Sequence, residues 1–212
     1  PARIALALLS VGNVALEQRE YTRARTLYEE SLAVETTGDA RIRARVLNNL
    51  GVLAQIQGDF ARALAIYEQC RQMWRDLGDT WSVATILVNI GDAASALGEG
   101  ERAGDCYRQS LIMRRDLGDR DGVRWTLQSM GYLAHRQGED ERAARVLAAA
   151  AVLAVQLGSN LAVYEQGHHD QNIEQIRDSL GEPAFATNWA QGQAMTHEQA
   201  IAYALSTGDQ VR

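Results

Sequence analysis

The stretch LNNLGVLAQIQGDFARALAIYEQC at residues 47–70 decides the fold, because its pattern returns along the chain at a nearly constant spacing. Its glycine, Gly51, has counterparts at Gly12, Gly91 and Gly131, so the offsets are 39, 40 and 40 residues. An alanine stands twelve residues after each glycine, and a large side chain four residues beyond that. These positions are Ala24, Ala63, Ala103 and Ala143, followed by Tyr28, Tyr67, Tyr107 and Leu147. Such a period is the signature of stacked supersecondary units.

Each repeat carries two apolar stripes at helical spacing. In the second repeat the first stripe is Leu47, Leu50, Gly51 and Ala54, and the second is Phe60, Ala63, Tyr67 and Cys70. Between the stripes, Gly58 suits the left-handed end of one helix and Asp59 the start of the next. Leu77-Gly78-Asp79 repeats this device between repeats, and Leu157-Gly158-Ser159 does so with Ser as N-cap. We therefore predict helical hairpins at residues 2–37, 40–77, 80–117 and 120–157.

Small residues at fixed places have a packing reason. Gly51 and Ala63, with their counterparts, are expected where the two helices of a hairpin cross most closely. A larger side chain there would force the two axes apart.

Composition agrees with an all-α chain. The 212 residues include only two prolines, and 46% are hydrophobic. The sequence contains neither a long apolar run nor the layout of a signal peptide, so we expect a cytoplasmic protein without membrane contact. A net charge of −6 without a basic block argues against nucleic-acid binding. We expect Cys70 and Cys106 to be free core thiols, and the chain to be part of a longer protein.

The repeat resembles the tetratricopeptide repeat family in a 40-residue variant, over residues 5–157. It departs from the family pattern where Leu8, Leu47, Leu87 and Leu127 replace a frequent Trp, and where Arg75 and Arg115 replace a frequent Pro. The resemblance implies an α-solenoid of antiparallel hairpins that binds proteins and has no catalytic activity. Residues 1–158 would form the four hairpins and residues 159–212 an irregular helical cap.

The expected cap has its own signals. Residues 160–180 can form one long helix, Pro183 can open a shorter one, and Thr196-His197-Glu198-Gln199 is a capping-box start. A second resemblance, to the segment that closes the repeats of bacterial STAND-type ATPases and LuxR-type transcription regulators, covers about 25 residues. It is carried by Phe185, Trp189, Gly192, Met195, Glu198 and Ala200. It implies a regulatory or sensor domain within a larger signalling protein.

The sequence shows no pattern of catalysis, cofactor binding or metal binding. It has no phosphate-binding loop of the form GxxxxGK[ST]. His168-His169-Asp170 would not converge on one ion, because adjacent helical residues point about 100° apart. His169 could pair with Glu165, which still leaves a metal site two ligands short. We expect Trp74, Trp81 and Trp189 to be core residues, and Trp125 to face the inner surface or a seam between repeats.

The first helix of each hairpin would line a concave groove, so its residues outside the buried stripe are the candidates for partner contact. These are Asn13, Arg45, Asn48, Asn49, Gln55, Asn89, Asp92, Trp125, Gln128, Tyr132, His135 and Arg136. A side-chain amide can meet both the N–H and the C=O of a bound peptide backbone. Alternatively, Asn49 and Asn89 bond only across neighbouring helices.

The main hypothesis is thus a scaffold that binds a protein or peptide in this groove. The alternative is an effector domain that closes on a small molecule or a short signalling peptide, in a pocket rimmed by Trp125, Tyr132 and His135. Self-association is a further partner class that the sequence leaves open. An enzyme would require a catalytic constellation that the sequence does not show.

Overall fold

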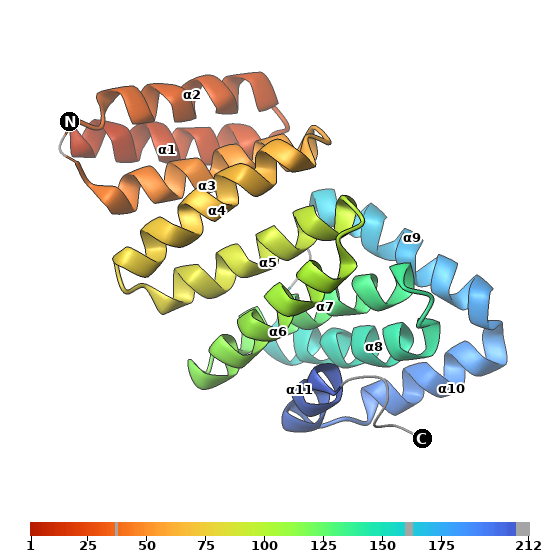
Figure 1. Cartoon of the computed structure of the whole chain (residues 1–212). Helices are drawn as coiled ribbons and strands as arrows, with labels where there is room; N and C mark the ends of the chain where they lie inside the picture. The colour runs from red at the N-terminus through yellow and green to blue at the C-terminus, as the bar shows by residue number, and fades with distance from the viewer. Residues whose placement is uncertain (37, 160–162, 207–212) are drawn as a thin grey trace. The chain divides into compact units, whose positions relative to one another are not determined.

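The computed structural model describes residues 1–36, 38–159 and 163–206, with backbone only for 163–166. Throughout these residues the chain is helical and contains no strand, which confirms the predicted all-α class. The helices are α1 (Ala2–Glu17), α2 (Tyr21–Val34), α3 (Ala40–Ile56), α4 (Phe60–Asp76), α5 (Thr80–Ala96), α6 (Gly100–Asp116), α7 (Arg120–Arg136), α8 (Asp140–Leu157), α9 (Val163–Leu180), α10 (Glu182–Gln193) and α11 (His197–Leu205) (Figure 1).

The helices belong to two compact units, Pro1–Ala103 and Gly104–Arg212, and the boundary between them falls within α6. In the first unit α1 pairs with α2, α3 with α4, and α4 with α5. In the second unit α7 pairs with α8, and α8 also contacts α9, α10 and α11. The consecutive antiparallel hairpins are typical of an α-solenoid.

Glycine ends the helices as the sequence predicts. Gly38, Gly58, Gly78, Gly98, Gly118, Gly138 and Gly158 all have φ between 63° and 81°. This left-handed conformation is readily available only to glycine. Each of these residues except Gly38 lies one or two residues beyond the end of a helix and redirects the chain, whereas α2 already ends at Val34.

The predicted acidic caps form only in part. The Asp39, Asp59, Asp79 and Asp119 side chains accept hydrogen bonds from backbone N–H groups of the following first turn. Glu139 makes no such bond at the start of α8. The hydroxyl of Ser159 donates to Asp121 over 2.8 Å, and residues 160–162, which it was predicted to cap, lie outside the described residues.

In each of three repeats a large side chain of the second helix packs against the glycine of the first helix. A Cβ added to Gly12 would lie 2.5 Å from the ring of Tyr28, and one added to Gly51 would lie 2.5 Å from the ring of Tyr67. Leu147 takes the same place against Gly131. The glycine thus accommodates the large side chain of the second helix, while the alanines Ala24, Ala63 and Ala143 are fully buried.

The tail closes the second unit. Phe185 of α10 and Ile176 of α9 share one core cluster with Ala143 and Leu147 of α8. Ile201 and Ala204 of α11 share another with Leu127 and Leu153. The capping box at Thr196 forms as predicted, and Gly181 separates α9 from α10. Residues 160–162 of the predicted long helix lie outside the described residues.

The predicted core positions of the tryptophans are confirmed for two residues and wrong for one. Trp74 is buried, and Trp189 is half-buried with its ring stacked on that of Phe185 at 5.3 Å. The expectation for Trp81 was wrong, because this residue is 55% exposed. It lies in the first turn of α5, two residues before Val83, the first buried residue of this helix.

Candidate binding surfaces

Four asparagines of the first unit form one hydrogen-bonded row across α1, α3 and α5. Asn89 donates to the Oδ1 of Asn48 over 3.0 Å, Asn48 donates to the Oδ1 of Asn49 over 3.2 Å, and Asn49 donates to the Oδ1 of Asn13 over 2.6 Å. We call these residues the asparagine row. Every amide in it is held in one orientation, because each bond joins an amino group to a carbonyl oxygen.

Tyr28 fixes the end of the asparagine row. Its hydroxyl donates to the Oδ1 of Asn13 over 3.0 Å, so this oxygen accepts from both Tyr28 and Asn49. Burial raises the pKa of Tyr28 to about 12, despite a hydrogen bond from Asn49 that lowers it. The phenol therefore stays protonated and can keep donating.

The row still has free hydrogen-bonding capacity. Each side-chain amino group carries two N–H bonds; within the described residues Asn48 uses one of them, whereas Asn49 bonds both Asn13 and Tyr28. Both residues are half-buried, whereas Asn89 is only 7% exposed. Asn49 and Asn89 occupy equivalent positions of the repeat in the sequence, but in the structure the side-chain amide of Asn49 is the more accessible one.

The other candidates of the first unit do not join this row. Gln55 accepts a hydrogen bond from the hydroxyl of Tyr67 over 3.1 Å. Arg45 is exposed on α3, and Asp92 is half-buried on α5.

In the second unit a chain of polar side chains runs from α7 to α9. Arg124 donates to the Oε1 of Gln128 over 3.3 Å, and Gln128 donates to the hydroxyl of Tyr132 over 2.9 Å. The same hydroxyl lies 2.7 Å from Nδ1 of His169. The sequence found Gln128 and Tyr132 but missed Arg124 and His169, because no local pattern reports that the tail returns to α7.

The remaining candidates of this unit lie apart from that chain. His135 contacts Asp140 over 2.5 Å and Gln175 over 3.4 Å. Trp125 is half-buried with the guanidinium of Arg114 5.5 Å from its ring centre, and Arg136 is exposed.

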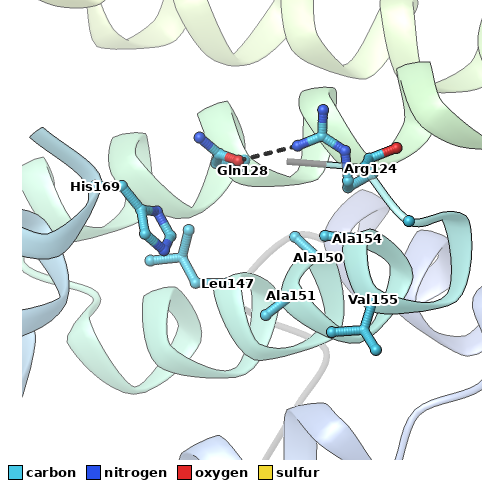
Figure 2. Close-up of a pocket in the computed structure, with 10 residues that line it drawn as sticks. Arg124, Gln128, Leu147, Ala150, Ala151, Ala154, Val155 and His169 are labelled. Atoms are coloured by element: carbon cyan, nitrogen blue, oxygen red, sulfur yellow. Dashed lines mark hydrogen bonds between the residues drawn. The ribbon is translucent and has the colours of Figure 1, made fainter. Parts of the chain in front are cut away.

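A pocket of about 470 Å³ lies between α7, α8 and α9 (Figure 2). Trp125, Tyr132 and His135, which we expected to rim a pocket, are not among the described residues that line it. Its polar lining residues are Arg124, Gln128, Ser159 and His169. The other lining residues are Leu147, Ala150, Ala151, Ala154, Val155 and Gly158.

Electrostatics at this pocket centre on Arg124. Its Nε bonds Asp121 over 2.9 Å. Burial pushes the pKa of Asp121 upward, but hydrogen bonds from Arg124 and Ser159 and the charges of Arg124 and Arg114 outweigh it, so the pKa is below its usual value. Burial lowers the pKa of His169, and the charge of His168 adds to this while that of Asp170 opposes it.

Within the described residues no group of three His, Cys, Asp or Glu side chains could hold a metal ion. His169 contacts Tyr132, while the side chain of Glu165, its predicted partner, lies outside the described residues. Cys70 and Cys106 are free and buried, and burial raises the pKa of Cys70 to about 12. In the part of the chain that the structure describes, no helix combines the length and apolarity needed to cross a bilayer.

The sequence of the repeats decides the family. The tetratricopeptide repeat family matches this chain at residues 3–76 and again at 82–151, which is more than half of its length. The chain belongs to the tetratricopeptide repeat family. Repeats of this family are protein–protein interaction scaffolds, generally without catalytic activity.

A solved structure shares the fold. BtubC (BKLC) from P. vanneervenii is similar with a TM-score of 0.62 and 18% sequence identity, over 92% of this chain and 78% of that chain. At this identity the similarity shows the fold alone. A search of curated protein sequences finds no match to the chain.

Proposed function

We propose that this tetratricopeptide repeat chain binds an extended protein or peptide segment along the asparagine row. The observation that carries the proposal is the connection of Asn89, Asn48, Asn49 and Asn13 into one row that spans three helices. A ligand that lies along it would meet fixed amides rather than mobile ones.

Preorganisation is the physical reason for this choice. A free asparagine side chain loses rotamer freedom when it binds, and that loss subtracts from affinity. In the row, this freedom is already lost in the unbound protein. The second N–H bond of Asn48 can then donate to a backbone carbonyl of a bound chain with little further ordering.

The test is a selection of peptides from a random library on the 212-residue protein, followed by affinity measurements on single variants. We expect selected peptides to lose about tenfold in affinity on Asn48→Ala, the effect of about one hydrogen bond left unmade in a desolvated contact. Glu30→Ala, an exposed change on α2, is the matched control and should leave affinity unchanged. Peptides that bind Asn48→Ala and the control equally well would contradict the proposal.

The context we propose is the regulatory arm of a larger bacterial signalling ATPase or transcription regulator in the cytoplasm. Its support is the segment from Phe185 to Ala200, whose spacing resembles the end of the repeat region in such proteins. The complete reading frame tests it, because an NTPase domain upstream or a helix-turn-helix downstream is expected. A frame that encodes neither would refute this context.

The alternative effector-domain function requires a pocket for a small molecule. The second unit contains one, although its lining differs from the residues that we expected. Its chemistry is distinct from that of the asparagine row.

A further inference from the structure

We propose that the pocket between α7, α8 and α9 binds a small organic carboxylate with a short apolar chain. The site belongs to the second unit alone and shares no residue with the asparagine row, so it stands independently of the peptide proposal. Its volume of about 470 Å³ falls within the range of small-molecule sites.

The cation of the site is Arg124. This residue is only 9% exposed and lies on the polar wall of the pocket. Within the described residues its hydrogen bonds engage Nε, with Asp121, and Nη1, with Gln128. Neither bond uses Nη2, and guanidinium is the side-chain group best suited to a carboxylate.

Arg124 also orients the rest of the polar wall. A guanidinium can only donate, so the amide oxygen of Gln128 must face Arg124 and its amino group must face Tyr132. The hydroxyl of Tyr132 accepts that bond and lies 2.7 Å from Nδ1 of His169, which also lines the pocket.

The polar wall consequently offers donors. The guanidinium of Arg124 can only donate, and the hydroxyl of Ser159 already gives its hydrogen to Asp121. Asp121, the nearby carboxylate, is not among the described residues that line the pocket. A ligand group that only accepts hydrogen bonds and carries negative charge fits this arrangement.

The opposite wall selects the rest of the ligand. Figure 2 shows Ala150, Ala151 and Ala154 along one side of α8, with Leu147 near His169 and Val155 at the far end. Short side chains leave room for a few methylene groups, each of which gains about 0.8 kcal/mol when it leaves water. A monocarboxylate with a short alkyl chain would place its head at Arg124 and its chain on the alanines.

The test is a titration of the ¹⁵N-labelled protein with pentanoate, pentanamide and pentylamine in separate experiments. Binding is monitored through the NMR signals of backbone amides and arginine side chains. We expect pentanoate to bind with a Kd of about 1 mM or tighter and to shift signals of Arg124, Gln128 and Ala151. Pentanamide and pentylamine, with the same alkyl chain, should bind at least about tenfold more weakly.

Two variants localise the site. Arg124→Met removes the guanidinium, and Ala154→Leu fills the apolar wall without changing charge. Each should weaken pentanoate binding by about tenfold or more. Ala7→Leu, the same change at an exposed alanine of α1, is the matched control and should bind as the unaltered protein does.

Ala154→Leu keeps the test decisive if Arg124→Met fails to fold. Equal affinity for pentanoate and pentanamide would overturn the assignment of a carboxylate. Absence of saturable binding, or unchanged affinity in a folded Ala154→Leu variant, would overturn the site itself.

Discussion

The ring of Tyr67 lies against Gly51 so closely that a Cβ on this glycine would approach Cε1 of the ring to 2.5 Å. The same relationship joins Gly12 to Tyr28 and Gly131 to Leu147. The glycine of the repeat is therefore a packing residue, which allows a large side chain of the second helix to reach the backbone of the first.

Gly51→Ala should accordingly destabilise the protein. The new methyl group must displace a fully buried ring, and overpacking of this kind costs about 1–3 kcal/mol. Part of the loss is offset by alanine's better helix propensity, about 1 kcal/mol. Urea denaturation gives the free energy of unfolding directly.

Gly167→Ala is the control for Gly51→Ala. Gly167 lies within α9, where an added Cβ meets no atom within 4 Å. Only the gain in helix propensity remains there, so this variant should be slightly more stable than the parent. A Gly51→Ala protein as stable as Gly167→Ala would show that the ring moves aside at no cost.

Val14 and Leu53 occupy equivalent positions in α1 and α3, two residues after Gly12 and Gly51, but their environments differ. Val14 is 51% exposed and Leu53 is 1% exposed within a core cluster with Tyr28 and Val46. Leu53→Ala should cost about 2–5 kcal/mol, whereas Val14→Ala should stay within about 0.5 kcal/mol. Comparable losses of unfolding free energy would mean that Val14 is covered in solution.

The fold was readable from the sequence because its determinants are local and recur. Gly58, Gly78 and Gly138 each need a left-handed backbone conformation, and the spacing between them fixes the helix lengths. Trp81 was misjudged because apolar character does not report whether a first-turn residue has reached the neighbouring helix. The partnership of Tyr132 with His169 was missed because α9 lies outside the repeat, so no period relates the two residues.

The histidines of α9 predict a pH dependence of stability. Burial lowers the pKa of both His168 and His169, with the charge of Arg136 contributing at His168. A histidine with a lowered folded-state pKa binds its proton more readily in the unfolded chain, so stability falls as pH drops below the unfolded value of about 6.5. Urea midpoints should therefore decrease between about pH 7.5 and about pH 5.5.

The variant His169→Phe separates the histidine contribution to the pH dependence of stability from the contribution of carboxylates. The variant should show a smaller decrease over that interval, because one of the two shifted groups is gone. Asp121 acts in a different window, since its lowered pKa stabilises the fold at neutral pH and that contribution is lost only below about pH 4. A decrease unchanged by His169→Phe would assign the pH dependence to other groups.

The asparagine row makes a prediction that distinguishes binding from structure. Asn49→Ala removes the bond to Asn13 and leaves the amino group of Asn48 without its acceptor, which should cost about 0.5–1.5 kcal/mol because water can reach this half-buried site. For a chain of this size, each kcal/mol lowers Tm by about 2–4 °C. Asn89→Ala removes one donor, at a position that is 7% exposed, so Oδ1 of Asn48 loses the hydrogen bond from Asn89.

A ligand on the row would lose affinity with Asn49→Ala beyond what the lower Tm explains, because the protein remains folded at the assay temperature. Tm and peptide affinity measured together for Asn49→Ala, Asn89→Ala and the Glu30→Ala control decide between the two roles. A lowered Tm with unchanged affinity would leave the row a purely structural link between α1, α3 and α5.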